Sequence, residues 1–489
     1  MPLSVLPNEI ISEIFNVFKP PEESPLQTDP AEYPLLFGQI CSKWRTISHS
    51  IPGLWTGIRL TLNQCTMKHD GMTHIQGWVS RARGNPLSVT ISSRPMSTSV
   101  KEANEFVRNI STVLTNVRHL CLVLPLQHFE ALNLIPEVAF RDLETFKIYM
   151  FLHQPGVETL SEARPRGLPV PLGLAHNLHS IQLISSFSMS SGLHRGVVMH
   201  GLVETMPWHQ LRRLRLTEST IDQALVCNIF RQCTCLEECV LEISDWAIPP
   251  RLNLDFVVVP TSLPYLHVLK WHFPQLPLAL IKSLTLPALD YLEIRVRQGD
   301  PTPAMYMVLL TLQSRSLLSL TTLVLSSVIF GPGQLVSALN NLLALRNLHL
   351  TRCYFFSSPT ITFCLTHNTE RNDTPFLPNL RSLLVSDPAI SASMNDNQTL
   401  DMLESRWSAP GSVDPPIGIA RLQKVSIDEY LDDDADGLIT LDPQPSEKSF
   451  ARSEALIRAG MDLSFPRMQR NSWRYGIQWE DDSDGSNED

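Results

Sequence analysis

The chain has 489 residues, 43% of them hydrophobic and 18% charged, with a formal net charge of -10 at pH 7. This length allows a large buried core, in several domains or in one long repeat array. The negative charge argues against a general nucleic-acid binder, and no run approaches the roughly eighteen apolar residues of a membrane helix. The N-terminus lacks the pattern of a signal peptide, and nine irregularly spaced cysteines indicate reduced thiols rather than disulfides. We therefore expect a soluble protein of the cytoplasm and/or nucleus that binds neither nucleic acid nor membrane.

Two short amphipathic helices are predicted at the N-terminus. Leu6, Ile10 and Ile14 lie four residues apart, and Pro7 suits a first helical turn, where its missing N–H would have no partner. The segment 19–34 is rich in proline and acidic residues, and we interpret it as an exposed loop before the helical spacing resumes. Two such helices bury too little surface to be stable alone, so they must pack on a partner or on the rest of the chain.

The same segment also carries a motif. An opening Leu-Pro, an apolar helix face and a later Ile-Cys-x-x-Trp-Arg occur at Leu6, Pro7, Ile10, Ile14, Ile40, Cys41, Trp44 and Arg45. This combination resembles an F-box, with a loop at 19–34 that is longer than usual. It is similar to the F-box-like domains expanded in mushroom-forming fungi, where Pro-x-Leu-Trp and Trp-x-x-Arg-x-x-x-x-Pro-Leu recur, here at 52–55 and 78–87.

The resemblance implies a partner. F-box helices bind a Skp-type adaptor, which connects them to a cullin scaffold and a ubiquitin-conjugating enzyme, and the eight motif residues above would form the adaptor-binding site. The alternative is an ordinary helical pair that only caps the next domain.

A leucine-rich motif, L-x-x-L-x-L or a close variant, recurs along most of the chain. Successive copies start about 23 to 42 residues apart, compared with the roughly 20 to 29 residues of a leucine-rich repeat. The last two apolar positions of each copy are two apart, so both point to one side of a strand. The copies begin at residues 117, 143, 178, 211, 236, 266, 289, 320, 345, 380 and 422.

Between these strands the apolar spacing becomes helical, at 99–114, 221–230, 305–312 and 335–343. Strand and helix alternating at this period predict an α/β leucine-rich-repeat solenoid, a curved parallel sheet with helices on its outer face. Only Cys353 clearly occupies the Asn or Cys position of the repeat. An ordinary parallel α/β sheet rich in leucine remains the alternative.

The concave face of such a solenoid is the predicted target-binding surface. The residue between the last two apolar positions of each motif points away from the helices. These residues share no chemical type, which favours recognition of a protein surface over catalysis on a small molecule, although simple solvent exposure is the alternative for each. The polar members chosen as target-binding are Lys147, Gln182, Arg215, Lys270, Glu293 and His349.

Two clusters imitate metal sites, and their spacing argues against both. The four cysteines within 227–239 lack the paired spacing of a zinc site, so buried thiols are the better interpretation. Residues 432–443 begin like a calcium-binding loop, but Pro443 stands where a bidentate glutamate is required. G-x-S-x-G, G-x-x-x-x-G-K and H-E-x-x-H do not occur in the sequence. We predict no catalytic residue, no metal and no cofactor.

Three parts are therefore expected: an F-box-like helical domain at 1–60, a degenerate solenoid at 61–470 and an acidic disordered tail at 471–489. Insertions are predicted at about 386–416 and 428–449. A final helix and strand would then close the solenoid.

Together, the motif and the repeats predict a non-catalytic substrate-recognition subunit of an SCF-type ubiquitin ligase. Such a subunit accelerates ubiquitin transfer by proximity, because it holds an unknown target protein beside the loaded enzyme. The main alternative is a leucine-rich-repeat interaction scaffold whose hairpin only caps the solenoid, and an enzyme with an unrecognised site is a third. If Leu6, Ile10, Ile14 and Ile40 all pack on the first repeats, the capping alternative is favoured.

Overall fold

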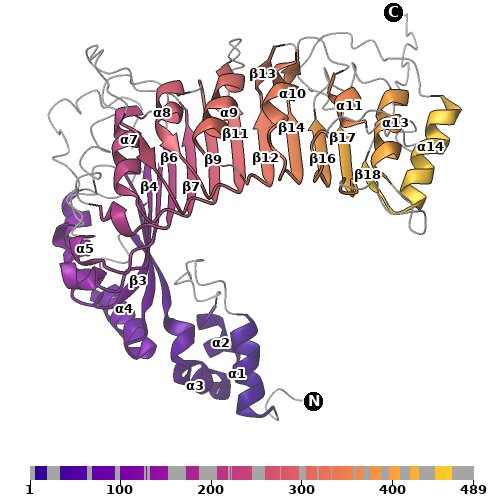
Figure 1. Cartoon of the computed structure of the whole chain (residues 1–489). Coiled ribbons are helices and arrows are strands. Elements are labelled where there is room, and N and C mark those ends of the chain that lie inside the picture. The colour runs from indigo at the N-terminus through magenta and orange to yellow at the C-terminus, as the bar shows by residue number, and fades with distance from the viewer. Residues whose placement is uncertain are drawn as a thin grey trace, which may run out of the picture. The chain divides into compact units, whose positions relative to one another are not determined.

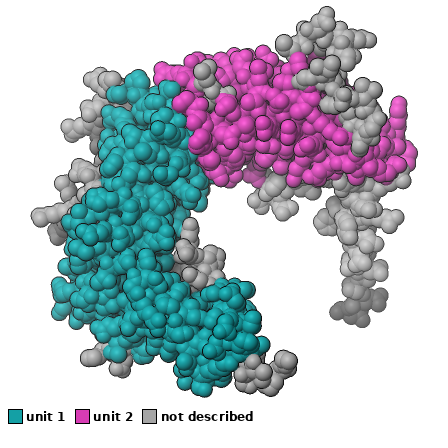
Figure 2. Space-filling view, turned by 60° about the horizontal axis from the view of Figure 1, so that its bottom comes forward, with its two compact units in different colours: residues 1–266, 272–274, 283–285 teal, residues 267–271, 275–282, 286–489 magenta. Residues whose placement is uncertain are grey.

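We describe the protein from a computed structural model. The described residues are 6–18, 33–62, 69–93, 100–125, 128, 133–151, 172–186, 206–218, 221, 223–244, 259–275, 277–296, 304–316, 319–331, 333–355, 360–366, 375–386, 396–407, 419–428 and 446–464. They divide into two compact units, coloured in Figure 2: unit 1 is 1–266, 272–274 and 283–285, and unit 2 is 267–271, 275–282 and 286–489.

Unit 1 begins with helices and continues as alternating strands and helices (Figure 1). Its first elements are α1 (Asn8–Val17), α2 (Leu35–Ile40), α3 (Ser42–Ser50) and the 3-10 helix η2 (Pro52–Trp55). Its main strands are β1 (Gly57–Leu62), β2 (Leu87–Ser93), β3 (Val117–Pro125), β4 (Thr145–Phe151), β5 (Ser180–Ser186), β6 (Arg213–Glu218) and β7 (Glu238–Ile243). Between them lie α4 (His69–Ala82), α5 (Val100–Ser111), α7 (Gln223–Gln232) and the 3-10 helices η4 (Glu137–Phe140), η5 (Leu172–Leu174) and η6 (Trp208–Gln210).

Unit 2 repeats the same alternation. Its main strands are β9 (Val268–Phe273, of which 268–271 belong to this unit), β11 (Tyr291–Val296), β12 (Thr322–Ser326), β14 (Asn347–Thr351), β16 (Ser382–Ser386), β17 (Lys424–Asp428) and β18 (Asp462–Ser464). Its helices are α8 (Leu278–Ser283), α9 (Ala304–Arg315), α10 (Gln334–Leu339), α11 (Thr360–Leu365), α13 (Asp396–Arg406) and α14 (Glu447–Arg458). Two-residue strands form two small sheets: β8 (Thr261–Ser262) with β10 (Leu284–Thr285) in unit 1, and β13 (Ile329–Phe330) with β15 (Tyr354–Phe355) in unit 2.

The strands form a 14-stranded sheet whose order follows the chain. Neighbouring strands pair in parallel with matching register, for example Leu348 opposite Leu383 and Leu383 opposite Val425. Helices lie on one face of the strands in each unit (Figure 1). The predicted α/β leucine-rich-repeat solenoid is confirmed, because each of the eleven predicted motifs lies on a strand of this sheet.

Buried leucines of the motif form the core between strands and helices. Along β14, Leu348 and Leu350 are buried while His349 between them is half-buried on the other face, as the alternation of a strand requires. Each such side chain contributes roughly 1.5 to 3 kcal/mol through burial. Cys353 is buried and its Sγ lies 3.4 Å from the carbonyl oxygen of Leu325, so it ties one repeat to the preceding one.

Several details differ from the sequence-based expectation. The predicted second helix is two helices, α2 and α3, because Cys41 between them is extended (φ -162°, ψ 169°). Strands β1 and β2 were not predicted, since Trp55 and Pro86 stand where the motif has its first leucine. Helix α13 lies between the two ends of the predicted insertion at 386–416, where Leu400, Leu403 and Trp407 already have helical spacing in the sequence, and α14 starts at Glu447, inside the predicted insertion at 428–449.

Candidate protein-binding surfaces

The N-terminal helices have a core of their own. Phe15 of α1 stacks on Phe37 of α2, with ring centroids 4.0 Å apart, and Trp44 of α3 meets Phe15 edge-on at 5.1 Å. Ile11 and Ile47 complete this buried cluster. Since aromatic pairs in these geometries add to the hydrophobic burial, the three helices are held together without using all of their apolar residues.

A second apolar stripe on the same helices is left exposed. Ile10 and Ile40 are 48% and 46% exposed, and Val17, Phe18 and Leu36 are also exposed. On α1, residues 10, 14 and 17 fall on one side of the helix, next to the side that carries the buried Ile11 and Phe15. These side chains of α1 and α2, together with the motif residues around them, form the surface that we call the hairpin face.

The predicted adaptor-binding residues occupy different environments. Pro7, Ile10, Ile40, Cys41 and Arg45 are exposed, and Leu6 and Ile14 are half-buried. Trp44, in contrast, is only 7% exposed. Its role in this structure is to position the helices, not to present a contact surface.

Hydrogen bonds also fix the ends of the hairpin. Arg45 Nε donates to the carbonyl oxygen of Gly38 at 2.7 Å, and Lys43 Nζ donates to that of Leu6, also at 2.7 Å.

The sequence predicted the hairpin face only in part. Phe18 and Leu36 belong to apolar spacings visible in the sequence, whereas Val17 was missed. The predicted loop at 19–34 lies outside the described residues except for Tyr33-Pro34 at its end.

The two later motif fragments meet in one cluster. Trp55 of η2 packs edge-on against Trp78 of α4, with centroids 4.9 Å apart, and Arg81 Cζ lies 4.7 Å from the Trp55 ring centre. Trp55 Nε1 donates to the carbonyl oxygen of Ser48 at 2.8 Å, which ties this cluster to α3. Burial, and then the positive charges of Arg81 and Arg45, lower the pKa of the neighbouring His49. The cluster joins the hairpin helices to the first repeat.

The sheet face opposite the helices carries the predicted target-binding residues. In unit 1, Lys147, Gln182 and Arg215 follow one another across β4, β5 and β6 in register. Arg215 Nη2 lies 2.8 Å from Glu242 Oε1, so this arginine is already in an ion pair. Their role in target binding stays a prediction.

In unit 2 the corresponding residues are less accessible. Glu293 is buried, and it accepts hydrogen bonds from Tyr291 Oη (3.0 Å) and Arg295 Nη2 (3.4 Å). His349 is half-buried, and burial followed by the charge of Lys424 lowers its pKa. Lys270 Nζ lies 5.3 Å from the Tyr291 ring centre. This face is thus a mixed polar and aromatic surface, much of it already engaged within the chain.

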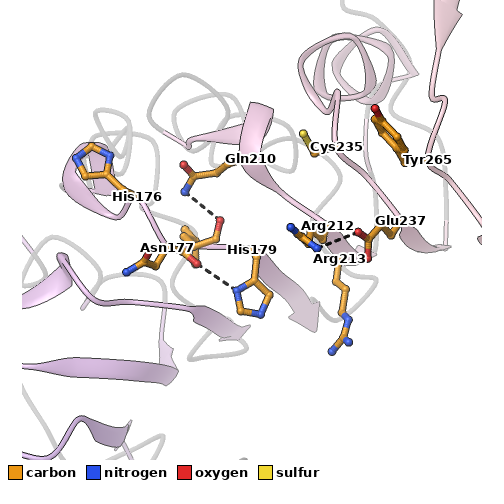
Figure 3. A pocket seen from close by; sticks show the side chains of 10 residues that line it. His176, Asn177, His179, Gln210, Arg212, Arg213, Cys235, Glu237 and Tyr265 are labelled. Carbon is orange, nitrogen blue, oxygen red and sulfur yellow. Dashed lines mark hydrogen bonds and ion pairs between the residues drawn. The ribbon is translucent and has the colours of Figure 1, made fainter.

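A groove opens in unit 1 at the edge where β5, β6 and β7 begin (Figure 3). Its volume is about 790 Å³, and its lining includes His176, Arg212, Arg213 and Tyr265. Gln210 Nε2 donates to two carbonyl oxygens of the preceding turn, at 2.6 and 3.0 Å, and so shapes one wall. The groove is open and has a mixed polar and apolar lining, which suits a peptide or a protein loop better than an enclosed small molecule.

The cysteine cluster is a part of the core. Cys227, Cys233 and Cys239 are buried, and Cys235 is exposed. Burial raises the pKa of Cys233 to about 12. Within the described ranges no group of three or more His, Cys, Asp or Glu side chains is arranged to hold a metal ion. The predicted calcium-like segment at 432–443 and the tail at 471–489 lie outside the described residues.

No family model and no curated protein matches the sequence. Among solved structures, the crystal structure of a complex of Rad7 and Elc1 in yeast is similar over 86% of this chain and 88% of that chain, at 13% identity and a TM-score of 0.34. At that TM-score the match adds nothing to the argument about function. None of the helices in the described ranges combines the length and apolar composition that crossing a bilayer requires.

Proposed function

We propose that this protein is the substrate-recognition subunit of an SCF-type ubiquitin ligase. The hairpin face binds a Skp-type adaptor, through which a cullin scaffold is recruited, and the repeats bind a target protein. The protein forms no covalent bond itself. It raises the effective concentration of target lysines near the ubiquitin-loaded enzyme, which accelerates transfer by proximity.

One observation carries the adaptor half of this proposal: the hairpin has a complete core and, beside it, an uncovered apolar stripe. A helical pair that only capped the solenoid would bury that stripe against the first repeats. Ile10 and Ile40 instead remain about half exposed. Exposed apolar side chains gathered on short helices are typical of a helix-mediated protein interface.

The test is direct binding of the full-length protein to a purified Skp-type adaptor. Ile10→Asp and Ile40→Asp each place a charge in the apolar contact, and we expect each to weaken adaptor binding about tenfold or more. Val138→Asp is the matched control, because Val138 is an exposed apolar residue of unit 1 on η4, outside the hairpin. It should bind the adaptor like the unmodified protein.

Circular dichroism and thermal unfolding would confirm that each variant remains folded. If the folded, unmodified protein binds no adaptor, or if Val138→Asp weakens binding as much as Ile10→Asp, the proposal is wrong. Adaptor binding without ubiquitin transfer to any bound protein would retain the adaptor site and contradict the ligase role.

A further inference from the structure

The residue that directly follows the first apolar position of each motif forms a regular row along the edge of the sheet. Main-chain hydrogen bonds connect its members: the Glu144 amide donates to the Arg118 carbonyl oxygen at 2.8 Å, and the Arg381 amide donates to that of Arg346, also at 2.8 Å. We call this the edge row. In unit 1 it contains Arg118, Glu144, His179, Arg212 and Glu237, and in unit 2 His267, Asp290, Thr321, Arg346, Arg381 and Gln423.

In unit 1 the arginines of the edge row are neutralised by the next member of the row. Arg118 Nε lies 2.9 Å from Glu144 Oε1, and Arg212 Nη1 lies 3.2 Å from Glu237 Oε1. Neighbouring strands are about 4.8 Å apart, so an arginine reaches the following glutamate easily. The row therefore has a built-in pattern in which a cation is followed by an anion.

Unit 2 departs from this pattern at Arg346 and Arg381. These two arginines are consecutive members of the row and both are exposed. Within the described part of the chain, neither has a carboxylate at ion-pair distance. Like charges that face each other on adjacent strands are destabilising. Folding alone therefore gives no reason for the second arginine.

A third cation extends the pair. Lys424 follows the row member Gln423; its amide donates to the Arg381 carbonyl oxygen at 3.0 Å, and it pairs in register with Ser382, one residue beyond Arg381. Its Nζ lies 3.8 Å from Asp462 Oδ2, and both side chains are more than half exposed. An ion pair that long and that exposed contributes little and leaves both groups accessible.

We propose that Arg346, Arg381 and Lys424 form a binding site for an acidic segment of a partner protein, an extended run of Asp and Glu side chains. This inference deepens the target-binding role proposed above and rests on it. The three cations stand on three neighbouring strands, about 10 Å from first to last across two strand spacings, and not around a single point. An extended peptide places the side chains of one face roughly 6.6 to 7 Å apart, so two of its carboxylates fit along this span and can each meet a cation.

Two further features of the site support a peptide. Leu343 is 58% exposed in the turn before β14, and Asn379 Nδ2 donates to its carbonyl oxygen at 2.8 Å, which joins the turns before β14 and β16. The exposed leucine offers an apolar contact beside the cations. The chain as a whole carries a net charge of -10. This net charge opposes an acidic ligand, so binding depends on the local positive charge of the patch, which acts over about one Debye length.

The test uses the full-length protein and a fluorescein-labelled octapeptide of glutamate, followed by fluorescence anisotropy. Arg346→Gln combined with Arg381→Gln should weaken binding about tenfold or more and reduce the dependence of affinity on salt. The matched control is Arg118→Gln, which removes an arginine of the same row that is already paired with Glu144, and it is compared with Arg346→Gln alone. We expect the control to change affinity by less than about twofold.

Each remaining outcome decides the question. Absence of binding by the folded protein at low salt, equal weakening by the control variant, or equal binding of a glutamine octapeptide would overturn the proposal. Binding to a phosphoserine peptide without any to the glutamate peptide would overturn the choice of carboxylates. Adaptor affinity, measured on the same variants, should stay unchanged, so failure of this site and failure of the hairpin face give different results.

Discussion

At the scale of single residues, Arg406 at the end of α13 is fixed by three hydrogen bonds to main-chain groups. It is buried, and its guanidinium donates to the carbonyl oxygens of Leu365 (2.6 Å), Leu377 (3.0 Å) and Phe376. Burial lowers its pKa to about 10, so the side chain is still protonated at neutral pH. A single arginine thereby satisfies three main-chain carbonyl groups that lie far from it in the sequence.

Replacing this arginine should destabilise unit 2. Arg406→Leu removes the donors and leaves the carbonyl groups buried without partners. We expect the free energy of unfolding to fall by about 2 to 4 kcal/mol, a value that already includes the gain from no longer burying a charge. Urea unfolding followed by fluorescence measures it. The nearby Arg458→Leu serves as a control, because Arg458 is exposed and pairs with Glu454 only at 3.8 Å. Equal loss in both variants would contradict the role of Arg406.

Thiol chemistry provides a second prediction at this scale. Because burial raises the pKa of Cys233 to about 12 and that of Cys239 as well, both stay protonated and unreactive at pH 8 in the folded protein. Exposed Cys235 and Cys41 should react with iodoacetamide first, and all should react after unfolding in urea. Mass spectrometry of the digested protein gives the order. Early modification of Cys239 would show that it is not the core residue described here.

At the scale of elements, the hairpin depends on aromatic packing between α1, α2 and α3. Phe37→Ala removes the ring that stacks on Phe15. We expect the free energy of unfolding of the hairpin to fall by about 3 to 5 kcal/mol, which is enough to unfold the hairpin locally. Hydrogen exchange should accelerate in α1, α2 and α3 and stay unchanged in β11 to β17. Phe18→Ala is the matched control, since Phe18 is largely exposed. Faster exchange after Phe18→Ala would contradict this distinction.

The regular elements of the repeats were predictable because their apolar positions have a fixed period. Eleven strands followed from the leucine motif, and the buried residues of α5, among them Phe106 and Ile110, from helical spacing. Strands β1 and β2 were missed because a tryptophan and a proline interrupt the motif. The break at Cys41 is invisible to periodicity, since its neighbours continue the apolar spacing.

The candidate sites were predictable only in part. On α1, the stripe of Ile10 and Ile14 and the stripe of Ile11 and Phe15 are adjacent and equally apolar, so no periodicity decides which one forms the core. The neighbours Arg346 and Arg381 are 35 positions apart in the sequence. Aligning the motif copies at their second position would have placed the two together, whereas their lack of an acidic partner emerges only from the side-chain positions.

At the scale of the whole molecule, each main strand pairs only with the strands next to it in chain order, so each repeat is stabilised by its immediate neighbours. Local damage should therefore stay local. Leu122→Ala in unit 1 and Leu348→Ala in unit 2 each remove a buried leucine and should each cost about 2 to 5 kcal/mol. Hydrogen exchange is expected to accelerate mainly in the strands that flank each substitution. Equal acceleration across all strands would instead indicate a single cooperative domain.

The edge row has a consequence for protein engineering. Its members are positioned by main-chain hydrogen bonds, and those named above as ion-paired have partly exposed side chains. Exchanging such side chains removes no main-chain hydrogen bond of the row. A library that varies consecutive members of this row would sample different orders of charge at one constant spacing, which makes the row a scaffold for selecting new peptide specificities without redesigning the fold.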